Sequence, residues 1–367
     1  MMRTWIKSSA ANALYGTGLD RLVGTLSGGR RTPLVIGYHR VVEDFAATAK
    51  TCIPSLLISG RMLQLHLEWI GRRYRFVDLD ELGALVESGS PMQQQVAAIT
   101  FDDGYEDFHD VALPILRKTG VPAALFVVSD LVGTTRAQIH DQLYFLLTGR
   151  HGRPCPDAGA ALPDITGMTP YQAVRALVEG TSIETLQQLI AVLESETSIP
   201  ETALGRTVTW EMLARLQRAG VIIGSHTKSH IVMTNEKPRR VLEEAVDSRV
   251  DLEQRLDVAV RHFAYPSGVF DATSVNAVAV AGYSFGYTSC THRSTRYPLL
   301  TIPRTLLWEH SCVDSNRTFS GPILSCHVNG AFGLVAGCGQ AHGSARARVG
   351  SRTGFAAAWQ PGQADDE

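Results

Sequence analysis

Residues 96–104 read VAAITFDDG, a short apolar run that ends in two adjacent carboxylates and a glycine. An apolar run of this length, bounded by turn residues, is typical of a strand in the interior of a sheet. The pattern therefore predicts a buried strand over 96–101 that presents Asp102 and Asp103 at its carboxyl end.

Similar runs recur along the chain and alternate with helical patterns. The other predicted strands are 33–39, 123–128, 221–225, 262–265, 284–287 and 300–303. Apolar residues at helical spacing predict helices over 61–72, 107–119, 210–219 and 239–256. Strands that alternate with helices indicate βαβ units and a mostly parallel sheet, either open or closed into a barrel.

Three parts of the chain depart from this alternation. Residues 140–201 are too long for an ordinary connection and contain helical patterns at 171–178 and 183–193, which predicts a helical insertion in a catalytic domain over 33–338. Residues 339–367 lack periodicity and are expected to be poorly ordered. Residues 1–32 are predicted to form an N-terminal helical segment with an apolar face. We expect this face to pack on the protein's own body, with contact to a membrane surface as the alternative. The apolar residues are Trp5, Ile6, Leu14, Leu19, Leu22 and Val23.

Composition narrows the classes of protein. The chain has 367 residues, of which 44% are hydrophobic and 19% charged, as in a globular protein. A net charge of −2 gives no electrostatic reason to expect nucleic acid as a partner. No run of about 18 apolar residues predicts a transmembrane segment. The N-terminal region lacks an uninterrupted apolar stretch, so we expect no signal peptide and a cytoplasmic location.

Chemically active side chains follow the predicted strands. Asp102 and Asp103 follow the strand over 96–101, and His226 follows the strand over 221–225. Residues at the carboxyl ends of parallel strands share one rim of the sheet. His230 lies four residues after His226, a spacing that on a helical turn places both imidazoles on one face. Two histidines and one carboxylate leave coordination positions open, as in catalytic zinc sites.

Four segments resemble one known family. They are TFDDGY at 100–105, HTKSH at 226–230, FAYPSG at 263–268 and GYHRV at 37–41. They are similar to signatures of the polysaccharide deacetylases, carbohydrate esterases that share the chitooligosaccharide deacetylase homology domain. The resemblance covers about residues 33–310.

The resemblance implies a distorted (β/α) barrel, usually of seven strands, and hydrolysis of an N-acetyl group on an amino sugar. It also implies roles for individual residues. Asp103, His226 and His230 become the ligands of a divalent metal, with zinc expected first and cobalt, nickel or manganese as alternatives. Asp102 becomes the general base that deprotonates the attacking water. A backbone N–H near Ser267 would help to hold the oxyanion.

Two departures from the family pattern leave roles open. Phe263 stands where the third motif commonly has an arginine that orients the catalytic aspartate. Arg304 is a candidate replacement, although an ordinary surface arginine is an equal alternative. Members of the family commonly supply the general acid from a late Leu-His motif, and the nearest equivalent here is LSCH at 324–327. The resemblance therefore assigns this role to His327, with His310 and His292 as alternatives.

The remaining expectations concern the ligand. The residues expected to contact substrate are Tyr105, Pro266, Ser267, His39 and Arg304. The predicted function is metal-dependent hydrolysis of an N-acetyl group on a polysaccharide or its lipid-linked precursor, with proteins of polysaccharide biosynthesis as further partners. Two alternatives remain open. One is a deformylase or another hydrolase that cleaves a C–N bond of a small amide, and the other is a catalytically silent barrel that binds glycan.

Overall fold

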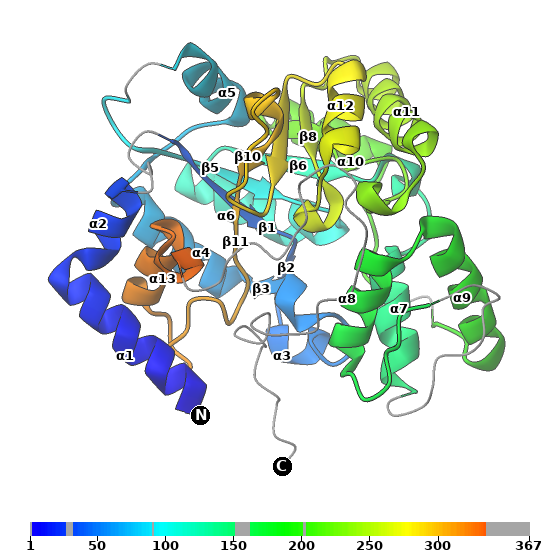
Figure 1. The fold of residues 1–367 in the computed structure, drawn as a ribbon, viewed down its shortest axis with the longest axis horizontal. Helices are drawn as coiled ribbons and strands as arrows, with labels where there is room; N and C mark the ends of the chain where they lie inside the picture. Colours follow the sequence, from blue (N-terminus) through cyan, green and yellow to red (C-terminus); the bar gives the residue numbers. More distant parts are fainter. Residues whose placement is uncertain (1, 27–31, 90–91, 151–161, 201–202, 335–367) are drawn as a thin grey trace.

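The computed structural model describes residues 2–26, 32–89, 92–150, 162–200 and 203–334. Among these residues the main sheet has nine strands, all paired in parallel, in the order β10-β9-β8-β7-β6-β5-β1-β11, with β4 beside β5 (Figure 1). The strands are β1 (Leu34–Tyr38), β4 (Arg75–Phe76), β5 (Val96–Phe101), β6 (Ala123–Val127), β7 (Ile222–Ser225), β8 (His262–Ala264), β9 (Phe285–Thr288), β10 (Ile302–Pro303) and β11 (Thr305–Leu306). A short parallel pair, β2 (Arg40–Val42) and β3 (Leu57–Ser59), follows β1 and precedes α4.

The two ends of the sheet meet within one short stretch of chain. β10 and β11 are separated only by Arg304, yet they lie at opposite ends of the strand order. The N–H of Arg304 donates to the carbonyl of Thr288 in β9, and the N–H of Leu307 donates to the carbonyl of Gly37 in β1, both at 2.9 Å. The sheet therefore nearly closes on itself, as the predicted distorted barrel requires, and Arg304 lies at the seam.

The closed sheet has an apolar interior and an apolar outer face. Every residue of β5 is buried, and alternate residues point to opposite sides of a strand. Ala98 packs with Val35 and Phe126 of neighbouring strands, and Leu79 and Leu82 of α5 (Leu79–Ser88) join this inner cluster. Ile99 and Phe101 belong to the larger cluster between the sheet and the surrounding helices.

Helices surround the sheet, and four of them lie where the periodicity predicted them. They are α4 (Gly60–Gly71), α6 (Leu113–Thr119), α10 (Trp210–Arg218) and α11 (Pro238–Leu256), whereas α12 (Ala272–Val280) was not predicted. The predicted helix over 107–119 begins as a π-helical turn, Phe108–Ala112. Pro114 has no backbone N–H to donate four residues back, which explains the wider turn before α6.

Within its described residues, the long connection between β6 and β7 contains three helices before α10. They are α7 (Ile139–Thr148), α8 (Pro170–Gly180) and α9 (Ile183–Glu196), and they form a group at one side of the barrel (Figure 1). Their apolar faces pack together and join the main core through residues such as Leu143, Leu177 and Leu189.

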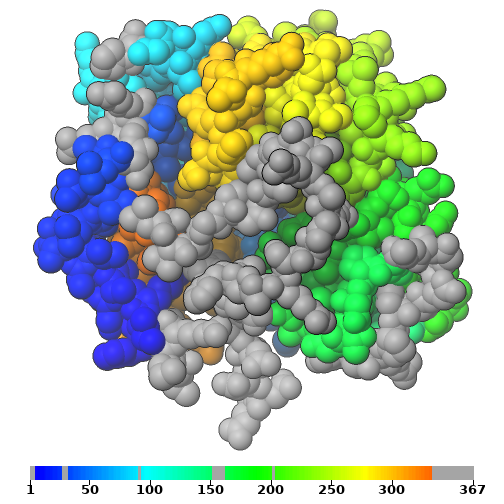
Figure 2. Space-filling view, in the orientation of Figure 1, coloured from blue at the N-terminus to red at the C-terminus, as the bar shows by residue number. Residues whose placement is uncertain are grey.

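The N-terminal segment forms α1 (Met2–Thr17) and α2 (Leu19–Leu26), which lie beside α13 (Gly321–Val328) (Figures 1 and 2). The docking face differs from the predicted one. Leu14 and Val23 do pack near α13, but Trp5, Ile6, Leu19 and Leu22 are exposed. The predicted disordered tail, 339–367, lies outside the described residues. Among the described helices, none combines the length and the apolar character that a membrane span requires.

Candidate metal centre and catalytic site

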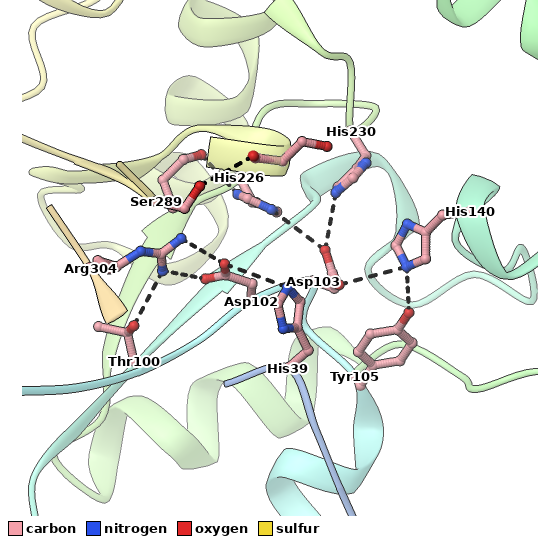
Figure 3. Close-up of polar contacts among 12 residues, drawn as sticks. His39, Thr100, Asp102, Asp103, Tyr105, His140, His226, His230, Ser289 and Arg304 are labelled. Carbon is pink, nitrogen blue, oxygen red and sulfur yellow. Dashed lines mark hydrogen bonds and ion pairs between the residues drawn. The ribbon is translucent and has the colours of Figure 1, made fainter. Parts of the chain in front are cut away.

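Asp103, His226 and His230 meet at the carboxyl ends of β5 and β7 (Figure 3). The Nε2 atoms of His226 and His230 lie 3.5 and 3.2 Å from Oδ1 of Asp103. All three side chains are buried, and one ligand atom from each lies within 4.8 Å of the others. This spacing and this set of nitrogen and oxygen atoms suit a divalent cation.

A tight turn aims the carboxylate of Asp103 at the histidines. Asp103 and Gly104 have φ values of 70° and 68°, so the chain reverses through two left-handed residues directly after β5. Aspartate tolerates this conformation better than most residues. A Cβ at position 104 would lie 2.9 Å from Cγ1 of Val127, so glycine is also required for the packing of β6.

The orientation of His226 is set by two hydrogen bonds. Its backbone N–H donates to the carbonyl of Val127 at 2.9 Å. Its ring Nδ1–H donates to the carbonyl of Ala264 in β8 at 2.8 Å. Because a carbonyl can only accept, Nδ1 carries the proton. Nε2 therefore keeps its lone pair for a metal, an arrangement common among metal-binding histidines.

The segment that joins the two histidines is not the predicted helical turn. Thr227 and His230 have φ values of 65° and 60°, so residues 226–230 form an irregular loop. Glu244 of α11 holds this loop. Its carboxylate accepts from the N–H groups of Lys228 and Ser229 at 2.9 and 2.8 Å, and from the Ser229 hydroxyl at 2.7 Å. The two imidazoles face each other because a buried carboxylate shapes the loop.

Glu244 was not predicted from the sequence, and it carries a testable consequence. We expect Glu244→Ala to weaken metal binding about tenfold or more, because residues that orient metal ligands have effects of this size. Chelator competition measures the dissociation constant. Glu243→Ala is the matched control, because Glu243 is the half-exposed neighbour that pairs with Arg239. Glu244→Gln keeps one acceptor oxygen and should recover part of the affinity, whereas equal metal affinity in all three variants would contradict this role.

The charges at this cluster favour a cation. Burial raises the pKa of Asp103, but His230, His140 and His39 outweigh burial and hold the pKa well below its usual range. Burial lowers the pKa of His226 to about 4, so this imidazole is neutral at pH 7. Neither carboxylate oxygen of Asp103 accepts a hydrogen bond from the described residues. A buried anion without donors is costly, and a bound divalent ion would compensate it. The residues present therefore fit a metal site.

Asp102 is held by a different partner. Nη1 and Nη2 of Arg304 donate to its two carboxylate oxygens, each at 2.7 Å, and Nη1 also donates to Thr100 at 3.2 Å (Figure 3). Burial raises the pKa of Asp102, but pairing with Arg304 outweighs burial and lowers the pKa overall. The carboxylate is therefore ionised and fixed beside the metal ligands. The structure brings Arg304 to the place where an arginine from the third motif was missing.

These groups lie in one cavity of about 300 Å³. Its polar floor contains Asp102, Asp103 and the histidines, with His39 at 4.0 Å from Oδ2 of Asp102. Leu307 and Trp308 after β11 form one wall, and α8 forms another with Tyr171 and Val178. A larger cavity of about 510 Å³ near α9 contains none of the cluster, so the smaller cavity is the candidate site.

The cluster and the fold agree with the comparisons with known proteins. A model of the family Polysaccharide deacetylase matches residues 89–286, more than half of the chain and a span that includes all three candidate ligands. This chain belongs to the polysaccharide deacetylase family.

Individual relatives are distant. The chain is 22% identical over 175 residues to YxkH of Bacillus subtilis, a protein assigned to the polysaccharide deacetylases, covering 47% of this chain and 60% of YxkH. It is 22% identical over 276 residues to the poly-beta-1,6-N-acetyl-D-glucosamine N-deacetylase of Escherichia coli, covering 75% of this chain and 36% of that protein. The chain thus spans less than two thirds of the length of these curated relatives.

Solved structures share the fold. The deacetylase PplD of Streptococcus pyogenes, solved with acetate, aligns with a TM-score of 0.52 at 18% identity, covering 81% of this chain and 97% of that chain. IcaB from Ammonifex degensii aligns with a TM-score of 0.52 at 17% identity, covering 82% of this chain and 97% of that chain.

Within this polysaccharide deacetylase fold, the predicted ligand contacts divide into two groups. His39, Ser267 and Arg304 line the cavity. Tyr105 does not reach a ligand, because it is fully buried and its hydroxyl donates to Asp141 at 2.7 Å. Pro266 is buried at the start of the turn that follows β8 and does not line the cavity. Trp308 and Tyr171, rather than Tyr105, are aromatic residues that line the cavity.

The prediction for the general acid places His327 in the wrong part of the molecule. His327 lies in α13, where its ring packs against Phe332 and its Nε2 contacts the carbonyl of Ser311 at 3.1 Å. Burial lowers the pKa of His327 to about 3, so this imidazole is neutral at pH 7 and carries no acidic second proton. It does not line the cavity of this deacetylase-family site. Its sequence motif placed it near the site, but α13 packs on the outside of the barrel.

His140 was missed as a site residue. Its Nε2 lies 3.7 Å from Oδ2 of Asp103 and 2.9 Å from the Tyr105 hydroxyl. The Tyr105 hydroxyl donates its only proton to Asp141, so Nε2 of His140 must carry the proton of the hydrogen bond between His140 and Tyr105. His140 therefore donates to the Tyr105 hydroxyl, and its ring lies beside the Asp103 carboxylate without a hydrogen bond to it. Gln138, two residues earlier, donates to the Asp103 carbonyl at 2.7 Å. The long connection after β6 thus supports the cluster, and the sequence offered no sign of this role beyond two polar residues at the start of an apolar helix.

Proposed function

We propose that this protein is a zinc-dependent N-deacetylase that hydrolyses the N-acetyl group of an amino sugar in a glycan. The observation that carries the proposal is the pairing of two buried carboxylates with different partners. Asp103 faces His226 and His230 without a hydrogen bond, and Asp102, the adjacent residue, is fixed by Arg304. One carboxylate is suited to bind a metal and the other to act on a proton.

Asp103, His226 and His230 would hold the ion. A zinc ion in such a site lowers the pKa of water toward neutrality and polarises a carbonyl oxygen. Zinc suits two imidazoles and one carboxylate with open positions, although cobalt, nickel and manganese share these ligands.

Asp102 would accept the proton of the attacking water. Its ionised state follows from the bidentate contact with Arg304, which also fixes the direction of its oxygens. A carboxylate already oriented near the acetyl carbon loses little entropy in the reaction. The backbone N–H of Ser267 is the candidate donor to the developing oxyanion, because Ser267 lines the cavity in a left-handed turn with φ of 56°.

His39 takes the place of His327 as the proposed proton donor to the leaving amine. It follows β1, lines the cavity, and keeps a partly exposed side chain within 4.0 Å of Asp102. Among the other histidines of the cavity, His226 and His140 have hydrogen-bond partners that fix them, and His230 lies 3.2 Å from Asp103 as a candidate ligand.

The assignment of His39 predicts a difference between two variants. His39→Gln should lower kcat about a hundredfold, because a positioned acid contributes on this scale, while zinc affinity stays unchanged. His327→Gln should leave kcat near the wild-type value, because His327 lies outside the cavity. Steady-state kinetics and zinc titration measure both quantities. A larger loss of kcat in His327→Gln than in His39→Gln would overturn the assignment.

The walls of the cavity favour a sugar. Trp308 and Tyr171 offer aromatic faces, which pack well against the apolar faces of pyranose rings, and Arg175 and Glu179 offer polar groups for hydroxyls. A surface polysaccharide or its lipid-linked precursor is the proposed source of the sugar, and proteins of polysaccharide biosynthesis are the proposed partners.

Release of acetate, or of formate from N-formyl substrates, by the purified, zinc-loaded protein tests this function. N-acetylglucosamine oligomers of increasing length are compared with N-acetylated and N-formylated small amides. The proposal expects release from oligomers and little from small amides. Release only from small amides would favour a small-amide hydrolase. Glycan binding without any release, in a protein shown to hold zinc, would favour a silent binding barrel.

A further inference from the structure

The N-terminal helix α2 packs with its polar side against the protein and its leucine side toward the outside. Its buried residues are Asp20 and Gly24, whereas Leu19, Leu22 and Leu26 are 46%, 52% and 79% exposed. Residues 19, 22 and 26 share one face of a helix, opposite residues 20 and 24. The helix therefore attaches to the protein through its polar side and presents its leucines to the outside.

Specific contacts hold α2 in this orientation. The hydroxyl of Ser325 and the amide of Asn329, both at α13, donate to Oδ2 of Asp20. A Cβ at Gly24 would lie 2.5 Å from Oδ1 of Asn329, so α2 lies close to the end of α13 and a larger residue would displace the Asn329 side chain. Rotation of α2 would break these polar contacts and bring leucines into this close approach. The outward position of the leucines is therefore built into the packing.

Exposed apolar side chains are concentrated in this segment. In the part of the chain that the structure describes, seven large apolar side chains are exposed, and five of them belong to α1 and α2: Trp5, Ile6, Leu19, Leu22 and Leu26. Figure 2 shows both helices along one edge of the molecule. A cluster of this kind on a folded protein marks a surface that contacts something apolar.

The charge of the same segment identifies the partner. Residues 1–32 contain five basic residues and one acidic residue: Arg3, Lys7, Arg21, Arg30 and Arg31, with Asp20. Asp20 is fully buried, whereas the basic Arg21 of α2 is exposed, so the described surface of α2 carries positive charge. Contact between two copies through this face would bring like charges together. An amphipathic segment with tryptophan, leucine and basic residues suits the interface of an anionic lipid bilayer.

We propose that α1 and α2 dock this protein on the surface of an anionic membrane, with Leu19, Leu22 and Leu26 inserted among the lipid headgroups. The helices are too short to span the bilayer, so the protein lies on one face. This inference does not depend on the catalytic proposal, because lipid binding is measured without any substrate.

Vesicle flotation of the full chain tests the proposal. The vesicles contain phosphatidylcholine alone or an equimolar mixture with phosphatidylglycerol. We expect the wild-type protein to float with the mixed vesicles, to float less with phosphatidylcholine alone, and to release at high salt. The triple variant Leu19→Glu/Leu22→Glu/Leu26→Glu should bind at least about tenfold more weakly. Val280→Glu is the control, because Val280 is 63% exposed on α12, outside the segment.

Thermal unfolding and light scattering accompany the flotation. All variants should unfold near the wild-type temperature, because the substituted side chains are exposed. Absence of wild-type binding to mixed vesicles would overturn the proposal, as would equal loss in Val280→Glu. A wild-type dimer that the triple variant dissociates, without vesicle binding, would assign the face to a second copy. If the triple variant unfolds at a lower temperature and the wild type again binds no vesicles, the leucine face packs instead against another segment of the same chain.

Discussion

Replacing Arg304 by methionine is expected to destabilise the protein by about 3–5 kcal/mol, because the variant leaves the Asp102 carboxylate buried without a partner. Catalysis should fall by at least about a hundredfold in kcat/KM, since Asp102 would lose its fixed orientation. Arg304→Lys should recover only part of both, because an ammonium cannot form the two parallel bonds of a guanidinium. Chemical denaturation and acetate release measure the two effects.

A second substitution separates the effect of the Asp102–Arg304 ion pair on stability from the effect of Asp102 on catalysis. Asp102→Asn added to Arg304→Met removes the buried charge, so stability should return while activity stays low. Arg296→Met is the control for loss of an arginine, because Arg296 is exposed and lies over the Tyr297 ring. An Arg304→Met variant as stable and as active as the wild type would exclude the proposed role.

The stability effect of Arg304 also depends on pH. Arg304 holds the pKa of Asp102 below its usual value, so the pair stabilises the folded state above the pKa of the unfolded chain, near about pH 4. This contribution disappears as the pH falls through the folded pKa. In Arg304→Met, burial alone would raise the pKa, so acid would protonate Asp102 and relieve the penalty. The stability difference between wild type and variant should therefore be full at neutral pH and should shrink in acid.

Replacing Asp103 by asparagine is expected to abolish zinc binding and to lower hydrolysis by at least about a thousandfold, because the bound ion supplies several kcal/mol of charge stabilisation. Asparagine tolerates the left-handed conformation that position 103 requires, so the turn should survive. The change therefore tests the charge of the ligand rather than the backbone.

Unfolding without substrate gives an independent readout. Zinc in hundredfold excess over its dissociation constant should stabilise the wild-type protein by about 2.7 kcal/mol, and Asp103→Asn should lose this increment. Asp110→Asn is the control, because Asp110 is an exposed carboxylate paired with His109. Wild-type zinc affinity in Asp103→Asn would show that the metal centre lies elsewhere.

Local patterns were sufficient for the strands and for the candidate ligands. The seven predicted strands correspond to β1, β5, β6, β7, β8, β9 and β10. These strands could be predicted because each is a short apolar run between turn residues, and such a pattern is visible from neighbouring residues alone. Asp103 and His226 follow two of these strands directly, so the parallel arrangement was enough to bring them to one rim.

Residues that act from helices were harder to predict. Glu244 supports the histidine loop from α11, and the available signal was its position three residues after Val241 on the apolar stripe of that helix, where a carboxylate requires a partner. For His327 the sequence motif was misleading, because α13 buries this residue away from the cavity. For α2 the sequence predicted an amphipathic helix but the wrong packing face. The polar side of α2, rather than its apolar side, packs against the protein.

The sequence by itself determined the parallel strands, the family and the cluster of Asp103, His226 and His230. Only the tertiary structure decided that Arg304 holds Asp102, 202 positions earlier in the chain. The physical reason is barrel closure. β10 and β11 attach one short stretch of chain to both edges of the sheet, and Arg304 lies between them. No local pattern encodes that contact, because it exists only when the two edges meet.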